Sequence, residues 1–393
     1  MFHRPSIIMK AQFLSSAAFL ASGAMAARPF LNEPDTAIEL SLPDLKVGDL
    51  APLEKMVGLP DFEFAARNYL SDANYTYYRN GAAGEWSYRQ NLELFQQYRL
   101  RPRTMIDVTK IEDSLPTTIL GHNFSAPFYI TPCARAGYAH PDAELNLVKA
   151  AGEQGLLYIP SHYASKTIEE IAEVKKEGQV LFQQVYLNSN HTRTQVEFDR
   201  AKAAGYKAIV FTVDAPAPGN RQRALRFGVG SSNTEYTYIT WDYYKNLTTL
   251  TDLPILLKGI QTVDDARLAL ENGVPGIILS NHGGRQLDTA RSSLEVALEI
   301  HNEEPDLFKK LEIFADGGVR YGNDALKLLA LGVKAVGVGR PFMYANIYGQ
   351  EGVEKAIELL KNEIAVDSAN LGVADLKKID HRYVIYNSLG YSG

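Results

Sequence analysis

One stretch of this sequence gathers residue types that are suited to acid–base chemistry. Residues 280–288 read Ser-Asn-His-Gly-Gly-Arg-Gln-Leu-Asp and follow an apolar run, Gly276–Leu279, that predicts a buried strand of a parallel sheet. His282 can accept a proton near neutral pH, Arg285 is a permanent cation, and two glycines allow backbone to approach a ligand. A glycine-rich turn with a surface histidine and arginine would have the same composition, so this stretch alone leaves both interpretations open.

Polar side chains follow several other apolar runs, and they fall into two groups. One group supplies glycine amides and two arginines, as phosphate sites in barrels do: Asp316-Gly317-Gly318-Val319-Arg320 and Gly337-Val338-Gly339-Arg340. The other adds to His282 a carboxylate, two arginines and two phenols: Asp214, Arg221, Arg285, Tyr77 and Tyr186. A carboxylate makes a neighbouring histidine more basic, and arginines can grip a substrate carboxylate. Lys258, between the groups, would place positive charge near an electron-accepting ring.

Eight short apolar runs recur from residue 127 onward, and helix-period segments separate most of them. Strands that alternate with helices predict a parallel sheet, and eight such units predict a closed (β/α)8 TIM barrel, with a doubly wound open sheet as the alternative. In a barrel the polar strand ends would meet at one mouth. The runs are Pro127–Pro132, Leu156–Ser161, Val180–Tyr186, Ala208–Asp214, Pro254–Gly259, Gly276–His282, Glu312–Gly318 and Ala335–Arg340.

The remaining segments are expected to be helices, an arm and one long connection. Residues 27–60 lack clean periodicity and are expected to wrap around the barrel. The connection between Asp214 and Pro254 far exceeds the usual length, which is typical of a lid. The expected helices are Asp61–Asn74, Pro141–Gly152, Trp241–Lys245, Asn323–Leu331 (ending at Gly332) and Glu351–Ile364. The first should bury a face made of Phe62, Ala65, Ala66, Tyr69 and Leu70.

The N-terminal residues indicate where the protein is located, and the composition limits the classes of partner that it can bind. Residues 1–26 predict a secretory signal peptide, with a basic start, the short apolar run Ala11–Ala21 and a small-x-small site at Ala24-Met25-Ala26. A secreted protein with sequons for N-glycosylation is therefore expected, with an arm over 27–60 and a barrel domain over 61–393 after the signal peptide. The net charge of −6, without a basic run, argues against nucleic acid as a partner. The sequons are at Asn74, Asn123, Asn190 and Asn246.

From about Phe62 to its C-terminus the chain resembles the FMN-dependent 2-hydroxy acid oxidase/dehydrogenase family, which includes glycolate oxidase and lactate oxidase. Residues 280–288 match the signature of that family without a gap. Other matching segments fall in family order: Tyr77-Tyr78-x-x-Gly81, Arg101-Pro102-Arg103, Gln184-Val185-Tyr186, Thr212-Val213-Asp214, Lys258-Gly259 and Asp316-Gly317-Gly318-Val319-Arg320.

The resemblance implies a role for each site residue. His282 would take a proton from a 2-hydroxy acid, and Asp214 would steady the imidazolium. No metal site is implied. The substrate-binding residues would be Tyr77, Tyr163, Tyr186, Arg221 and Arg285. The FMN-binding residues would be Pro132, Cys133, Ala134, Ser161, Gln184, Thr212, Lys258, Ser280, Asp316, Gly317, Gly318, Arg320, Gly339 and Arg340.

The resemblance also implies an activity, with some departures from the family pattern. Cys133, the pair His162-Tyr163 and the sequence Gly219-Asn220-Arg221 differ from the usual residues, so the wall above the substrate differs. We expect oxidation of a small, lactate-like L-2-hydroxy acid, with O2 reduced to H2O2, because no haem-binding domain precedes the barrel. The loop after the fourth strand lacks an apolar membrane anchor. A dehydrogenase that uses a quinone or other acceptor, and a catalytically inactive flavin-binding barrel, are the alternatives; a homotetramer is expected.

Overall fold

The computed structural model describes residues 36–187, 190–230 and 236–385. The expected signal peptide at residues 1–26 lies outside this range, as does the first part of the expected arm, and both stay predictions. Residues 51 and 53 of the arm are held against the barrel, because Tyr348 Oη donates to the carbonyl of Ala51 at 2.7 Å and Lys355 Nζ to that of Leu53 at 2.7 Å. In the part of the chain that is described, no helix is both long and apolar enough to cross a bilayer.

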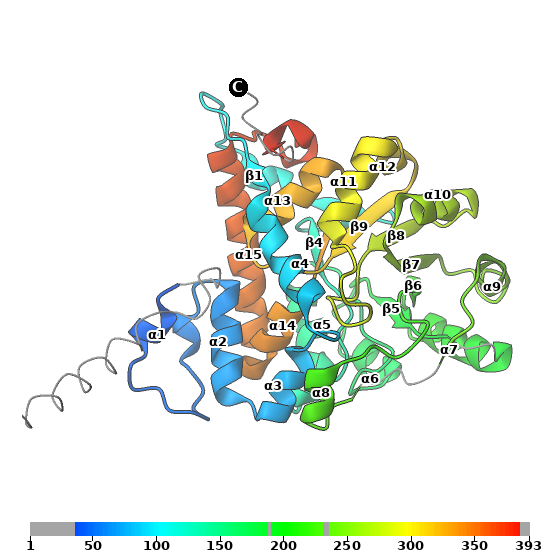
Figure 1. Cartoon of the computed structure of the whole chain (residues 1–393), viewed down its shortest axis with the longest axis horizontal. Coiled ribbons are helices and arrows are strands. Elements are labelled where there is room, and N and C mark those ends of the chain that lie inside the picture. Colours follow the sequence, from blue (N-terminus) through cyan, green and yellow to red (C-terminus); the bar gives the residue numbers. More distant parts are fainter. Residues whose placement is uncertain (1–35, 188–189, 231–235, 386–393) are drawn as a thin grey trace, which may run out of the picture. The chain divides into compact units, whose positions relative to one another are not determined.

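Seven parallel strands form one sheet in the spatial order β4-β10-β9-β8-β7-β6-β5 (Figure 1). Tyr158 closes the ring, because it bridges in parallel to Ile130 at the end of β4 and to Leu181 just before β5. The predicted (β/α)8 barrel is thus confirmed, and the open-sheet alternative is wrong. The strands are β4 Phe128–Ile130, β5 Phe182–Val185, β6 Ala208–Thr212, β7 Ile255–Ile260, β8 Gly276–Leu279, β9 Glu312–Asp316 and β10 Val336–Val338.

One predicted strand, Leu156–Ser161, is reduced to those two bridges at Tyr158. Its backbone still pairs on both sides: Ile130 N–H donates to Leu157 and Gln184 N–H to Pro160. Pro160 has no N–H to donate, which interrupts a regular ladder. The segment therefore fills the second position of the barrel without being a full strand.

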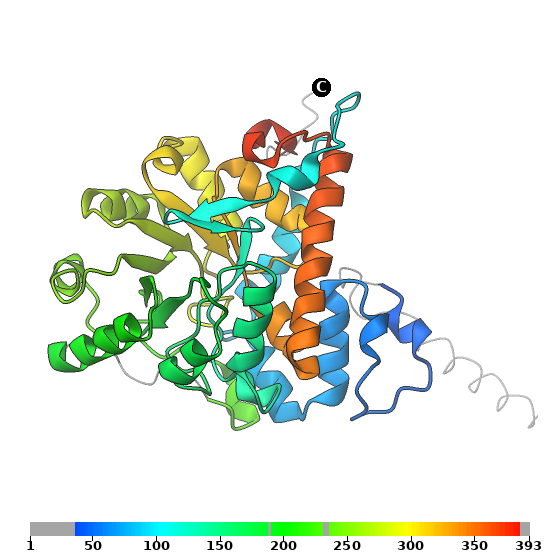
Figure 2. The same cartoon turned by 180° about the vertical axis from the view of Figure 1, so that it is seen from behind.

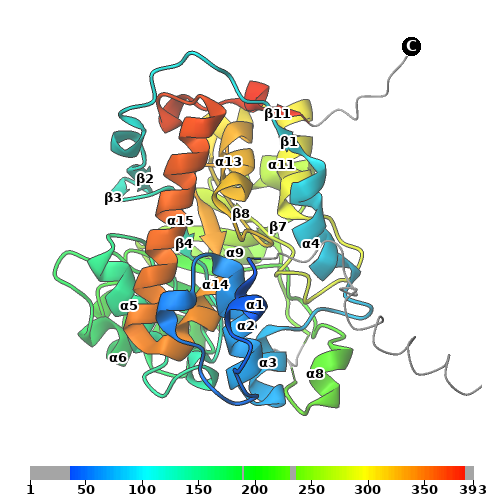
Figure 3. The same cartoon turned by 90° about the vertical axis from the view of Figure 1, so that its left-hand side faces the viewer.

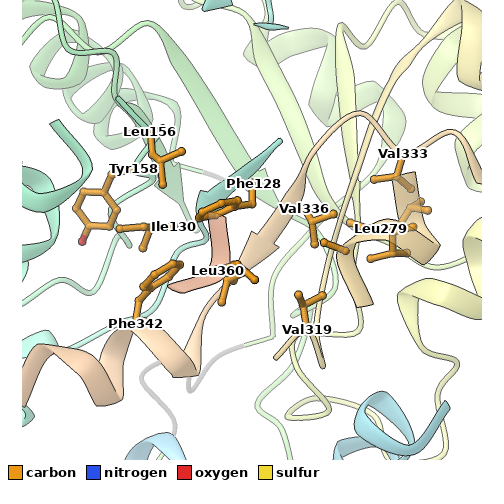
Figure 4. Close-up of a cluster of buried hydrophobic side chains, with 14 of the residues drawn as sticks. Phe128, Ile130, Leu156, Tyr158, Leu279, Val319, Val333, Val336, Phe342 and Leu360 are labelled. Carbon is orange, nitrogen blue, oxygen red and sulfur yellow. The ribbon is translucent and has the colours of Figure 1, made fainter. Parts of the chain in front are cut away.

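Side chains alternate between the two faces of the barrel wall. Ile209 and Phe211 on β6 pack outward against helices, whereas Val210 packs into the barrel interior. A hairpin of β2 (Thr117–Ile119) and β3 (His122–Phe124) adds Ile119 and Phe124 to that interior cluster. Figure 4 shows part of the outer layer, where Phe128 and Ile130 of β4 lie beside Phe342. Period-two alternation explains why the strands read as continuous apolar runs, since both faces are buried.

Helices cover the outside of the sheet, and α15 lies between α5 and α13 (Figures 2 and 3). Local sequence sets several helix starts: Thr167 with Glu170 and Ser292 with Glu295 form capping boxes. The covering helices are α5 Glu144–Glu153, α6 Ile168–Glu173, α7 His191–Ala203, α10 Val263–Glu271, α11 Ser293–Glu303, α12 Leu307–Lys310, α13 Gly322–Leu331, α14 Arg340–Ala345 and α15 Gly349–Leu371.

The expected helix Asp61–Asn74 is wrong as a single element. α2 spans Leu59–Tyr69, and α3 spans Asp72–Tyr78 after Ser71, whose Oγ accepts the N–H of Asn74 at 3.3 Å. Phe62, Ala65 and Ala66 are buried as expected, but Tyr69 is 41% exposed. The break turns α3 so that Tyr77 and Tyr78 are buried. Before α2 lies α1 Ile38–Ser41, and after α3 lie α4 Trp86–Gln97 and β1 Arg99–Leu100, which pairs with β11 Val384–Ile385.

The other expected helices are present with shifted bounds. α5 begins three residues later than predicted, at Glu144, and α15 extends beyond the expected Glu351–Ile364 at both ends. α13 ends as expected at Gly332, whose φ of 113° is readily adopted only by glycine. The long connection after β6 contains the expected α9 Trp241–Leu247 and an additional short helix, α8 Gln222–Arg226.

Candidate active site

The carboxyl ends of the barrel strands converge on one cavity, which nearly all of the predicted site residues line. Asp214 and Ser280 do not line it; each lies one hydrogen bond behind it. Among the described residues, no group of three or more His, Cys, Asp or Glu could hold a metal ion. The predicted residues in the lining are Tyr77, Pro132, Cys133, Ala134, Ser161, Tyr163, Gln184, Tyr186, Thr212, Arg221, Lys258, His282, Arg285, Asp316, Gly317, Gly318, Arg320, Gly339 and Arg340.

His282 and Asp214 form a buried pair at the end of β8 and β6. His282 Nδ1 lies 2.8 Å from Asp214 Oδ1, and the two side chains are 9% and 0% exposed. Because the carboxylate accepts, Nδ1 carries the proton and Nε2 keeps its lone pair, which lies 3.2 Å from Tyr186 Oη. Burial lowers the pKa of His282 to about 4, although Asp214 opposes that shift. The imidazole is therefore neutral at pH 7, as a general base must be.

The backbone around this pair is unusual. His282 has a φ of 59°, in the left-handed region that non-glycine residues rarely adopt, and its N–H donates to Ser280 Oγ at 3.0 Å. Gly259 has a φ of 109°, and a Cβ there would lie 2.5 Å from Cβ of Asp214. Only glycine at position 259 lets Asp214 stand behind His282, so the Lys258-Gly259 motif also has a steric role.

Lys258 belongs to a buried polar network below the cavity. Its Nζ donates to Ser280 Oγ at 2.9 Å and lies 3.1 Å from Asp316 Oδ2. Ser280 donates to Asp316 Oδ1 at 2.6 Å, and Thr131 to Oδ2 at 2.7 Å. Burial alone would raise the pKa of Asp316, but Lys258 and these hydrogen bonds outweigh it and hold that pKa below its usual value. Ser280 thus orients Lys258 and His282 from behind. Thr131 was not among the predicted site residues, although it directly precedes Pro132 at a strand end.

Two arginines lie close together beside the histidine. Arg221 is 8% exposed; its Nε donates to the carbonyl of Arg285 at 2.9 Å and its Nη2 to Gln286 Oε1 at 2.6 Å. Burial and the neighbouring Arg285 lower the pKa of Arg221 to about 10. An anion bound between the two guanidinium groups would relieve this repulsion. The departure at Asn220 therefore does not displace Arg221 from the cavity.

An aromatic wall adjoins His282, since the rings of Tyr186 and His282 stack with centroids 6.3 Å apart. The rings of Tyr163 and Tyr186 stack with centroids 5.2 Å apart, and His162 meets Tyr163 edge-on at 5.0 Å. Burial lowers the pKa of His162 and raises that of the Cys133 thiol, so both groups are neutral. This wall is uncharged and offers bulk rather than charge to a substrate side chain.

Hydrogen bonds fix the remaining polar residues of the lining. Gln184 Nε2 donates to Thr212 Oγ1 at 2.8 Å, and Ser161 Oγ donates to Gln184 Oε1 at 3.2 Å. At the other end Arg320 Nη1 lies 3.7 Å from Glu63 Oε2. Glu63, on α2, is a lining residue that the sequence analysis missed, because nothing in the sequence pattern predicts that α2 reaches the barrel mouth.

Arg340 lines the cavity as predicted, and its guanidinium also has structural contacts. Its guanidinium donates to the backbone carbonyls of Tyr78 at 2.8 Å, Asn80 at 2.9 Å and Gly283 at 3.0 Å. Arg340 thus ties the end of α3 and the 280–288 stretch to the end of β10. These contacts join residues far apart in sequence, so spacing gave no signal for them.

Comparison with known proteins gives the family. The sequence model described as FMN-dependent dehydrogenase matches residues 66–238 and 230–386. The chain belongs to this family. The resemblance stated from the sequence is thereby confirmed, and with it FMN as the cofactor.

Relatives within the family include both cytochrome-linked and oxidase enzymes. L-lactate dehydrogenase (cytochrome) of Wickerhamomyces anomalus is 37% identical over 84% of this chain and 61% of its own length. L-lactate oxidase of Nostoc sp. is 35% identical over 85% of this chain and 100% of its own length. 2-Hydroxyacid oxidase 1 of Mus musculus is 36% identical over 86% of this chain and 99% of its own length. The chain therefore spans less than two thirds of the cytochrome-linked relative.

Solved structures agree with the fold. A flavocytochrome b2 variant superposes with a TM-score of 0.82 at 36% identity and covers 91% of this chain and 92% of that one. Mandelate oxidase with 3,3-difluoro-2-hydroxy-3-phenylpropionic acid gives a TM-score of 0.77 at 34% identity. The match covers 84% of this chain and 98% of that one. Both share the barrel with this chain.

The lining fits FMN on its own chemistry. Gln184, Thr212 and Ser161 offer neutral hydrogen-bonding groups, which suit the heteroatoms of a flavin ring. Lys258 offers a buried cation, and Arg320 offers a guanidinium beside Gly317 and Gly318, as a phosphate requires. These residues would hold the cofactor, which supplies a two-electron acceptor.

Proposed function

We propose that this protein oxidises a small L-2-hydroxy acid to the corresponding 2-oxo acid, with FMN as the immediate oxidant. One observation carries the proposal: a neutral His282, with an unprotonated Nε2 facing Tyr186 Oη and Asp214 behind Nδ1, lies beside two arginines in the FMN cavity. The oxidation of a hydroxy acid requires a group that accepts a proton from the substrate, next to a site that binds the substrate carboxylate. A barrel that only binds flavin would have no use for this combination.

Each side chain has a distinct task in this scheme. Arg221 and Arg285 bind the substrate carboxylate, which places the hydroxyl-bearing carbon within reach of His282. His282 Nε2 accepts the proton, and Asp214 stabilises the imidazolium that results. Tyr77 and Tyr186 hydrogen-bond the carboxylate or the hydroxyl. Lys258, held by Ser280 and Asp316, would place a positive charge beside bound FMN and so favour its accepting electrons.

A lactate-like acid suits the cavity best. The stacked Tyr163 and Tyr186 form a close aromatic wall, which favours a short side chain on the substrate. The wall contributes no charge, so an uncharged side chain is expected there. Glycolate and larger acids are the competitors to be tested.

We propose O2 as the electron acceptor, giving H2O2. The relatives that match over nearly their whole length, L-lactate oxidase and 2-Hydroxyacid oxidase 1, carry oxidase names, which supports this choice. The alternative is a dehydrogenase with a quinone or other acceptor. The cytochrome-linked relative at 37% identity favours that alternative. The homotetramer and the secreted location expected from the sequence stay predictions.

An anaerobic absorbance titration of the purified FMN-loaded protein tests this function. L-lactate should bleach the flavin faster than glycolate or L-mandelate, and re-admitted air should restore it with one equivalent of peroxide. Restoration without peroxide would contradict the oxidase proposal and favour the alternative acceptor. If none of the three acids bleaches the flavin, the hydroxy-acid proposal itself is wrong.

A further inference from the structure

The short helix α8 directly follows Arg221, yet it has almost no hydrophobic anchor of its own. It is five residues long, and an isolated helix of that length is not stable in water. Within Gln222–Arg226, which the structure describes in full, only Ala224 is buried, whereas Leu225 is 68% exposed. Apolar packing therefore does not fix the place of α8, and a different kind of contact has to do so.

A carboxylate from another segment holds α8, which lies beside α3 (Figures 1 and 3). Arg223 Nε donates to Glu85 Oε1 at 2.8 Å, and its Nη2 donates to Oε2 at 2.8 Å. Arg79 Nη1 donates to the same Oε2 at 3.2 Å, and the N–H of Gly81 donates to Oε1 at 3.0 Å. Bidentate pairs fix geometry as well as charge, so Glu85 determines where Arg223 and its helix lie. We call Arg79, Glu85 and Arg223 the clasp.

The backbone conformation at Glu85 is one that few residues adopt. Its φ is 59°, in the left-handed region where glycine would be unstrained. Its side chain is 8% exposed. Burial alone would raise the pKa of Glu85, but hydrogen bonding to Arg223 and the charge of Arg79 outweigh burial and lower that pKa to about 2. Such a conformation persists where the surrounding contacts offset its cost, and here those contacts are made by the ionised carboxylate.

The turn that presents Glu85 also holds the backbone on two sides of the anion site. The N–H of Ala83 donates to the carbonyl of Asn220 at 2.7 Å, and the N–H of Ala82 donates to the carbonyl of Gly284 at 2.8 Å. The residues that follow these two carbonyls are the two arginines of the anion site. A shift of this turn would therefore be passed directly to both of them.

The arginines of the clasp do not belong to the anion site itself. The lining of the FMN cavity includes Arg221 and Arg285 but neither Arg79 nor Arg223, all four of which the structure describes. Glu85 thus binds Arg223 outside the cavity, while Arg221, two residues earlier, lies inside it. The clasp contacts α8 but not the cavity, so its effect on a bound anion comes through the position of Arg221.

We propose that Glu85 is a positioning residue, which through Arg223 holds Arg221 where it can bind the substrate carboxylate. The inference rests on the proposed function, in which Arg221 and Arg285 bind that carboxylate. When the clasp is broken, α8 loses its bidentate anchor and Arg221 moves among several positions. The substrate then binds more weakly, whereas proton transfer to His282 changes less, so KM rises more than kcat falls.

Two variants that break the clasp change the charge in opposite directions, which separates position from charge. Glu85→Gln removes a negative charge, and Arg223→Gln removes a positive one. If the clasp positions Arg221, both should raise KM for L-lactate about fivefold, with kcat falling less than about twofold. The double variant should be no worse than either single variant, because each single change already breaks the pair.

Pyruvate binding and hydrogen exchange test the same variants without turnover. The Kd of pyruvate, measured by calorimetry on the FMN-loaded protein, should rise about fivefold in both. Amide exchange of peptides covering residues 219–226 should become about tenfold faster. Glu169→Gln is the matched control and should change neither: Glu169 accepts the same kind of bidentate pair from Arg200 Nε at 2.8 Å and Nη2 at 2.9 Å, but it joins α6 to α7 and does not line the cavity.

The contrary results differ in what they overturn. Opposite changes of KM in Glu85→Gln and Arg223→Gln would mean that charge acts on the anion site and position does not. Unchanged exchange at residues 219–226 in both variants would mean that Glu85 does not hold α8. Faster exchange with an unchanged KM and pyruvate Kd would reduce the clasp to a structural pair. All three leave the proposed function standing, whereas a wild type that neither oxidises a hydroxy acid nor binds pyruvate overturns that function and this inference with it.

Discussion

Two cavities meet at the catalytic pair, because His282 lines the first and Asp214 lines the second, and the net charges of their linings have opposite sign. Arginines and Lys258 surround the first, whereas carboxylates and aromatic rings surround the second. One hydrogen bond of 2.8 Å joins them, and Gln286 lines both. The base therefore works in a cationic environment that binds anions, while its supporting carboxylate is buried behind it.

This separation of charge explains how the base is tuned. Burial, Arg285 and Lys258 lower the pKa of His282, and Asp214 raises it. If the carboxylate lay within the first cavity, it would pair with an arginine and weaken the anion site. Placed behind the histidine, it fixes the tautomer without competing with the substrate carboxylate. The partition between the two cavities is thus a functional arrangement that mutations can test.

The largest expected effect comes from removing the base. His282→Ala should lower kcat by about 10³-fold or more while FMN stays bound, because general-base catalysis contributes about 10²–10⁴-fold. Turnover under saturating substrate and the flavin absorbance together measure this. His191→Ala, at an exposed histidine, is the control and should leave turnover unchanged. Full turnover in His282→Ala with FMN retained would refute the catalytic assignment.

Asp214→Asn should remove the base without removing the imidazole. The amide can donate to Nδ1 of His282 and so force the proton onto Nε2; we expect a loss of about 10²–10³-fold in kcat. Turnover under saturating substrate measures this, and the flavin absorbance checks that FMN stays bound. Full turnover in Asp214→Asn would show that this carboxylate does not fix the tautomer of His282.

Arg221→Lys tests the cationic cavity alone. Lysine keeps the charge but cannot donate to both the carbonyl of Arg285 and Gln286. The two hydrogen bonds that position the Arg221 side chain are therefore lost. KM for the hydroxy acid should rise about tenfold, with a smaller fall in kcat. Arg226→Lys, an exposed neighbour on α8, should have no effect. An unchanged KM would remove Arg221 from the anion site.

Much of the fold could be predicted because its signals are local. Buried parallel strands read as apolar runs, and Gly332 marks the end of α13. Leu156–Ser161 shows the limit of such signals: apolar content predicts a strand, but Pro160 interrupts the ladder. The split between α2 and α3 was missed because the helical period continues through Ser71, and only the cap shows the break.

The candidate site shows a similar division. Strand-end position placed His282, Lys258 and the arginines at one mouth, because parallel strands end on the same side. The position of a residue along the chain does not predict whether its side chain lines the cavity or lies behind the side chains that do. Asp214 and Ser280 were therefore predicted as site residues, but the structure places both behind the cavity lining. The second cavity was not predicted. It depends on how α9 packs over β6 and β7, which is a tertiary contact without a sequence motif.

The smallest expected effect is in the pH profile, and its sign follows from the cationic environment of the base. With a pKa of about 4, His282 is neutral and able to accept a proton at all pH values above that, so kcat/KM should vary less than about twofold between about pH 8 and about pH 5.5. With a histidine of the ordinary pKa of about 6.5, kcat/KM would fall about tenfold over the same interval.

At the alkaline end kcat/KM should fall as the pH rises through about 10, where Arg221 loses its proton. Steady-state kinetics across this range at constant ionic strength measure both limbs. An acid limb near pH 6.5 would mean that Asp214 outweighs burial and the neighbouring cations, and that the two cavities do not divide the charge as proposed.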